Sequence, residues 1–172
     1  MKEQFLAQKA RGLALAENLT DEQLNARPDS DTWSLGMQLD HITVVLEKAT
    51  SEMEKALASG ITPGNATDWK PNFLERKFIQ MVGVQPGGRT NPVPKDFEPS
   101  EAHLEKDALL LRYVAAHEKL IRIVERTEKA NLKRIQVASA ALPWLKLSLG
   151  AWFAAMENHT SYHLEKVKNL QS

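Results

Sequence analysis

Two histidines lie four positions apart near the C-terminus, in the stretch ENHTSYHLEKV of residues 157–167. In a helix, His159 and His163 are one turn apart and point the same way. Neutral imidazole is a common ligand of divalent metals, and this spacing lets both rings converge on one ion. The spacing therefore indicates a metal site if a third ligand exists. The alternative is a pair of hydrogen-bonded core histidines.

The third ligand has two candidates among the five histidines of the chain. His41 lies in LDHITVV, near the start of an expected helix and beside its main apolar stripe. His117 lies on the apolar stripe of another expected helix. Periodicity alone favours His117, but the residues themselves leave the choice open, and either could be a core histidine. His103 is expected to be exposed.

The chain contains no cysteine. Disulfides, thiolate metal ligands and a cysteine nucleophile are therefore excluded, and any metal must be held by imidazole nitrogen and oxygen. If the chemistry involves a thiol, that thiol must arrive with the substrate.

Apolar residues recur with helical spacing almost everywhere outside the middle of the chain. We expect long helices over residues 2–18, 35–59, 101–128 and 149–170, the last three capped by Ser34, Ser100 and Ser148. Thr20 and Gln23 have capping-box spacing for a further short turn of helix.

The apolar stripes of these helices have the alternating three- and four-residue steps that suit bundle packing. The stripe of helix 35–59 comprises Leu35, Leu39, Ile42, Leu46, Ala49 and Met53. His159 and His163 fall within the corresponding stripe of helix 149–170, so both are expected to face the core.

Residues 60–99 contain five of the eight glycines and six of the eight prolines. This composition predicts an irregular segment, apart from a short helix at about 72–82. The expected fold is all-α: a four-helix bundle in which residues 60–99 form a long crossover between the second and third long helices. The length favours a single domain over residues 1–172.

The 22 basic and 22 acidic residues cancel, which argues against binding to nucleic acid or to an anionic membrane. No apolar run approaches the 18 residues of a transmembrane helix, and the charged start lacks the apolar run of a signal peptide. We therefore expect a soluble, cytoplasmic protein.

Two stretches resemble the DinB-like superfamily. In RPDSDTWSLGMQLDHI, residues 27–42, a proline and a polar loop precede Trp33 and Ser34, and His41 follows seven residues after Ser34. In LPWLKLSLGAWFAAMENHTSYHLEKV, residues 142–167, a proline-containing loop leads into a helix with the H-x-x-x-H spacing. The resemblance implies that His41, His159 and His163 bind a divalent metal, zinc or nickel foremost and iron or manganese otherwise. It thereby decides against His117 as the third ligand.

The resemblance also implies a class of activity. Such proteins include metal-dependent thiol S-transferases that act on small molecules with a low-molecular-weight thiol, and a hydrolase is compatible with the same site. The alternatives are a metal-binding protein without catalysis and a structural bundle without metal. The family name implies no action on DNA, and a homodimer is expected because bundles often pair through a helical face.

Several further residues have two interpretations each. The segment of residues 60–99 could cover the open metal position. Its cations could bind an acidic thiol such as glutathione or bacillithiol, or they could simply keep the loop soluble. These cations are Lys70, Arg76, Lys77, Arg89 and Lys95. Carboxylates are expected to orient the ligand rings. The carboxylates nearest to the histidines in sequence are Asp40, Glu157 and Glu165. The simpler interpretation is that all three are solvated surface charges. The expected core anchors are Trp33, Trp152 and Phe153.

Overall fold

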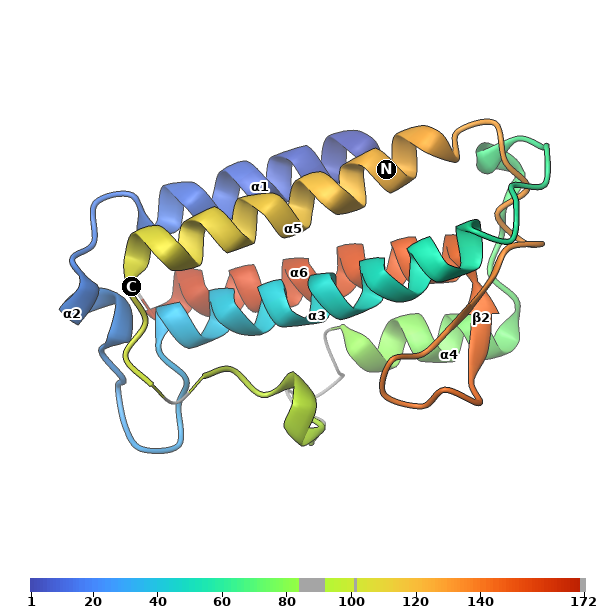
Figure 1. Cartoon of the computed structure of the whole chain (residues 1–172). Coiled ribbons are helices and arrows are strands. Elements are labelled where there is room, and N and C mark those ends of the chain that lie inside the picture. Colours follow the sequence, from blue (N-terminus) through green and yellow to red (C-terminus); the bar gives the residue numbers. More distant parts are fainter. Residues whose placement is uncertain (84–91, 101, 171–172) are drawn as a thin grey trace.

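The computed structural model describes residues 1–83, 92–100 and 102–170 (Figure 1). Within these ranges the protein is mostly helical, which confirms the predicted helical class, and it adds one small antiparallel sheet. The α-helices are α1 (Lys2–Ala16), α2 (Asp21–Asn25), α3 (Leu35–Leu57), α4 (Phe73–Val82), α5 (Lys106–Arg126) and α6 (Leu149–Leu170). The sheet joins β1 (Gln136–Ala138) to β2 (Lys146–Ser148), and η1 (Ala66–Asp68) and η3 (Lys95–Phe97) are short 3₁₀ helices.

The four long helices α1, α3, α5 and α6 lie side by side (Figure 1). α3 contacts both α5 and α6, and α1 contacts the same two helices. Each helix contributes fully buried side chains to the shared core, including Phe5, Leu46, Tyr113 and Phe153. Burying one large apolar side chain contributes about 1.5–3 kcal/mol. None of the described helices is both long and apolar enough to cross a membrane.

α3 is buried along its predicted stripe. All six stripe residues are buried, namely Leu35, Leu39, Ile42, Leu46, Ala49 and Met53. Ser34 is the predicted N-cap, and its Oγ accepts a hydrogen bond from the Met37 amide at 3.1 Å. Met37 and His41 are buried as well, so the first half of the helix is enclosed on two sides.

α5 begins later than the sequence predicts. The expected start at residue 101 with Ser100 as cap is wrong, because the helix begins at Lys106. Asn25 holds the backbone of Leu104 outside the helix: the Leu104 amide donates to Asn25 Oδ1, and the Leu104 carbonyl accepts from Asn25 Nδ2. Asp21 Oδ1 then accepts from the Lys106 amide. Both partners belong to α2, which therefore fixes where α5 starts.

The connection into α6 contains a hairpin that the sequence analysis did not predict. β1 and β2 pair antiparallel with Val137 opposite Leu147. Trp152 Nε1 donates to the Val137 carbonyl at 3.1 Å, which ties the hairpin to α6. Ser148 Oγ accepts from the Ala151 amide at 3.3 Å, so the predicted cap of α6 is confirmed.

α4 is the predicted short helix of the segment between α3 and α5. Asn72 and Glu75 form a capping box at its start. Glu75 is buried, and its Oε1 also accepts from the Ser148 amide at 3.1 Å. Trp69 Nε1 donates to Ser148 Oγ at 2.9 Å. These bonds connect the middle segment to the start of α6. Residues 84–91 of the middle segment lie outside the described part of the chain.

Candidate metal centre

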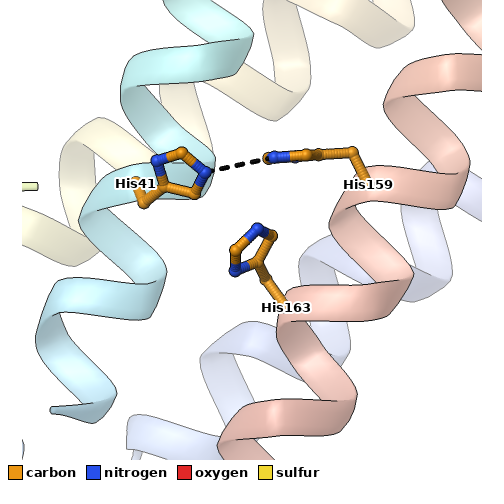
Figure 2. A group of neighbouring side chains, drawn as sticks. All are labelled: His41, His159 and His163. Atoms are coloured by element: carbon orange, nitrogen blue, oxygen red, sulfur yellow. Dashed lines mark hydrogen bonds between the residues drawn. The ribbon is translucent and has the colours of Figure 1, made fainter. Parts of the chain in front are cut away.

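Three histidines from two helices meet between α3 and α6 (Figure 2). His41 comes from α3, and His159 and His163 come from successive turns of α6. One ring nitrogen from each lies within 4.8 Å of those of the other two, and the Nε2 atoms of His41 and His159 are 3.1 Å apart. His41 and His163 are buried, and His159 is half-buried. The structure thus brings together the three residues named from the sequence; their role as metal ligands stays a prediction.

Two of the rings are oriented by hydrogen bonds at Nδ1. His41 Nδ1 lies 2.7 Å from the Phe97 carbonyl oxygen, and His163 Nδ1 lies 2.7 Å from Gln38 Oε1. Both oxygens only accept hydrogen bonds, so each Nδ1 carries the proton and each Nε2 presents a lone pair. This is the tautomer that a metal ligand needs.

The spacing of the rings fits a shared ion. Two imidazole nitrogens on one tetrahedral zinc, at the usual Zn–N length, are about 3.3 Å apart. The separation of 3.1 Å between His41 Nε2 and His159 Nε2 is close to that value. His159 differs from the other two rings, because its Nδ1 atom is buried and no described residue accepts a hydrogen bond from it. The donor set and its spacing therefore suit a divalent metal.

Burial keeps all three rings neutral near pH 7. Desolvation is the largest cause that lowers the pKa of His41. It lowers the pKa of His159 to about 3, with a smaller contribution from His41. The pKa of His163 is also lowered, first by burial and then by the two neighbouring histidines. Neutral rings have lone pairs free for a metal at physiological pH.

Half-buried aromatic side chains border the histidines. The Trp33 ring centroid lies 5.0 Å from that of His41 and 6.2 Å from that of His163. The Tyr162 ring lies 5.0 Å from the His163 ring. The prediction of Trp33 as a core anchor is wrong, because it is only half-buried and lies against the site. Trp152 and Phe153 are buried in the core as predicted.

Asp40 is not the solvated charge that the simpler interpretation predicts. Its side chain is buried, and Oδ1 lies 3.0 Å from Arg112 Nη1 while Oδ2 accepts from the Ser100 amide at 2.9 Å. It contacts neighbours of the site and holds no ligand ring. The interpretation as a surface charge is right for Glu165, which is exposed and pairs with Arg11 at 2.8 Å. Glu157 is half-buried.

The acceptors that do orient the rings were missed from the sequence. Gln38 lies one turn before His41 in a buried part of α3, and a polar residue in that position was an available clue. Phe97 contributes only its backbone carbonyl, which no side-chain pattern reveals.

His117 lies apart from this group. It is fully buried on α5, its Nδ1 donates to the Tyr113 carbonyl at 2.9 Å, and its Nε2 has no partner among the described residues. Burial lowers the pKa of His117 to about 4. A second group of possible ligands, Asp21, His103 and Glu105, is largely exposed, and Asp21 already caps α5.

The cations predicted to meet an acidic thiol are exposed where the structure describes them. Lys70, Arg76, Lys77 and Lys95 are all at the surface, and Arg89 lies outside the described residues. Lys77 Nζ lies over the Phe73 ring, 5.7 Å from its centroid, on α4. Their exposure is compatible with either interpretation, so the choice between a solubilising role and contact with an acidic thiol stays a prediction.

Comparisons with known proteins give one match. A sequence model described as the DinB superfamily matches residues 4–167. No curated protein matches the chain. No solved structure matches it either.

Proposed function

Because the chain belongs to the DinB superfamily, as its resemblance predicted, we propose that His41, His159 and His163 bind one divalent metal ion in a metal-dependent enzyme. The observation that carries the proposal is the meeting of three neutral imidazoles from two helices, with donor nitrogens within 4.8 Å of one another. Three protein ligands leave a tetrahedral ion at least one open position, which is typical of catalytic sites.

The side chains around the ion have defined tasks in this proposal. Phe97 and Gln38 hold the protons of His41 and His163 at Nδ1, so that both Nε2 lone pairs point at one place. A divalent metal there supplies Lewis-acid chemistry, which lowers the pKa of a thiol or water that reaches the open position. An all-imidazole set suits zinc or nickel, with iron or manganese as alternatives.

We favour a thiol S-transferase acting on a small molecule with a low-molecular-weight thiol. The chain has no cysteine that could compete with that thiol for the metal. Hydrolysis of a small-molecule substrate is the second candidate, because an open metal position activates water equally well.

Metal content tests the site. Protein purified without a polyhistidine tag should contain about one equivalent of zinc, nickel, iron or manganese by elemental analysis. His41→Ala, His159→Ala and His163→Ala should each lose most of it, with helical content checked by circular dichroism. His103→Ala is the matched control, since His103 is exposed, and should keep its metal. Full occupancy in all three site variants, or none in the unaltered protein, would refute the proposal.

Turnover tests the enzyme assignment separately. Metal-loaded protein should conjugate a small thiol to an electrophile, and His159→Ala should not. Stoichiometric metal with no thiol conjugation and no hydrolysis across a broad substrate screen would leave a metal-binding protein without catalysis.

We also propose that α1, α3, α5 and α6 are the four-helix bundle of this family, with residues 60–99 as the crossover. The contacts of α1 and α3 with both α5 and α6 support this arrangement. Residues 1–172 then form a single domain, which should unfold in one transition by circular dichroism and by tryptophan fluorescence. Two separate transitions would contradict a single domain.

A further inference from the structure

Lys166 of α6 places a positive charge in the neighbourhood of His41 and His163. Its Nζ lies 4.6 Å from the centroid of the Tyr162 ring, one turn earlier on the helix. The centroid of that ring lies 5.0 Å from that of His163. Lys166 and Tyr162 are both half-buried. The Tyr162 ring therefore borders His163, and the Lys166 ammonium group lies against that ring.

The ammonium group of Lys166 has no ion-pair partner among the described residues, and nearby carboxylates are committed elsewhere. Glu165, the adjacent residue on α6, pairs with Arg11 at 2.8 Å. Asp40, the adjacent residue to His41, pairs with Arg112 at 3.0 Å. A half-buried cation without a carboxylate partner is available to a ligand.

The positive charge of Lys166 acts on two of the histidines, His41 and His163. Burial is the main cause that lowers the pKa of His163 and of His41, and the positive charge of Lys166 lowers both further. At His41 the carboxylate of Asp40, which pairs with Arg112, raises the pKa and outweighs Lys166. At His163, no carboxylate of the described residues opposes the effect of Lys166.

We propose that Lys166 binds the anionic group of the small molecule that uses the metal centre. This inference rests on the proposed function and deepens it. The ligand carries a carboxylate or comparable oxyanion in addition to the atom that reaches the histidines. A divalent metal held by three neutral imidazoles adds to the positive charge, so an anion is favoured over a neutral or cationic molecule of the same size.

The aromatic rings on two sides strengthen this recognition. Trp33 lies against His41 and His163, and the Tyr162 ring lies near both His163 and the Lys166 ammonium group. Rings in these places exclude water, and a charge-assisted hydrogen bond is stronger in the lower dielectric that results.

The experiment compares two thiols of similar size on the zinc-loaded protein by titration calorimetry. Mercaptoacetate carries a carboxylate and mercaptoethanol carries a hydroxyl. The measured quantity is the ratio of their dissociation constants. Lys166→Met should reduce the preference for mercaptoacetate about ten-fold, equivalent to about 1.4 kcal/mol. Chelation of zinc by the carboxylate is common to both proteins and cancels in this comparison.

Two further variants separate a specific contact from general charge. Lys166→Arg keeps the charge and should keep most of the preference. Lys168→Met removes one positive charge from the exposed face of the same helix and should leave the preference unchanged. If Lys168→Met reduced the preference for mercaptoacetate as much as Lys166→Met does, the inference would be overturned.

Zinc content measured on the same samples distinguishes the two proposals. This inference alone is wrong if the unaltered protein binds zinc but prefers mercaptoacetate no more than Lys166→Met does. The same holds if the unaltered protein binds zinc but neither thiol. If the unaltered protein binds no zinc, the proposed function fails and the inference fails with it.

Discussion

His41 donates a hydrogen bond from Nδ1 to the carbonyl oxygen of Phe97 at 2.7 Å, so η3 directly orients a ring of the candidate metal centre. The same stretch is anchored a second time, because the Ser100 amide donates to Asp40 Oδ2 at 2.9 Å. Asp40 and His41 are consecutive residues of α3. The backbone of residues 97–100 is therefore held against α3 at both ends. The Asp40 carboxylate, which holds the Ser100 end, also pairs with Arg112.

Removing the Asp40 carboxylate should weaken both the fold and metal binding. Asp40→Ala leaves the Ser100 amide and one side of Arg112 without a partner, at a cost of about 1–3 kcal/mol in the free energy of unfolding. The Phe97 carbonyl should then hold His41 less firmly, and zinc affinity should fall. Urea unfolding and zinc titration against a competing chelator measure the two effects.

Glu47 provides the matched control for Asp40. It lies on the same helix and contacts the same arginine, with Oε2 at 2.8 Å from Arg112 Nη2, but its side chain is 43% exposed. Exposed ion pairs contribute about 0–1 kcal/mol, so Glu47→Ala should change stability little and zinc affinity not at all. Equal zinc affinity in Asp40→Ala and Glu47→Ala would contradict the anchoring role.

Gln38 should affect metal binding through His163 alone. Gln38→Leu removes the acceptor for the His163 Nδ1 proton, and loss of such a partner typically lowers metal affinity about 10–100-fold. Gln38→Glu keeps an acceptor at the same length and should retain the affinity of the unaltered protein. The same chelator competition measures both variants. An unchanged zinc affinity in Gln38→Leu would show that the ring needs no acceptor.

The sequence predicted the site in part because its strongest feature is local. The one-turn spacing of His159 and His163 is visible in any helical reading. The third histidine of the site cannot be identified from local spacing, because the choice between His41 and His117 depends on which helices are neighbours. α3 packs against α6, and this packing brings His41 to the pair. Periodicity within one helix carries no information about such neighbours.

The sequence analysis missed two parts of the fold, each for its own reason. The start of α5 is set by Asn25 and Asp21 of α2, which bind the backbone of Leu104 and Lys106. The β-hairpin has strands of three residues each, too short for an alternating pattern to be recognised. At the start of α5, tertiary hydrogen bonds therefore override the local helical preference.

His117 should make the protein less stable in acid. Its pKa is lowered from 6.5 to about 4 by burial, so the folded state keeps it neutral while the unfolded chain takes up a proton below pH 6.5. The unfolded state binds more protons in this window, and stability therefore falls as pH drops from 6.5 toward 4. The contribution of His117 between pH 7 and pH 5 is about 2 kcal/mol.

A variant without this imidazole isolates its contribution to the pH dependence. His117→Leu should lose less stability between pH 7 and pH 5 than the unaltered protein, as measured by urea unfolding at each pH. The buried histidines of the metal centre remain in both proteins, so their effect is shared. His103→Leu, at an exposed position, should keep the original dependence. Identical pH dependence in His117→Leu would show that His117 is not held neutral.

Gly12 tests the packing of α1 against α5. A methyl group at this position would overlap the ring of Tyr113, whose hydroxyl donates to the Gln8 carbonyl at 2.9 Å. In an open helix, Gly→Ala stabilises by about 1 kcal/mol. Here overpacking should dominate, and Gly12→Ala should lower the free energy of unfolding by about 1–3 kcal/mol. In a Tyr113→Leu background the same change should become neutral or stabilising, because the ring is gone. A stabilising effect in the presence of Tyr113 would mean that α1 and α5 pack less closely than the structure shows.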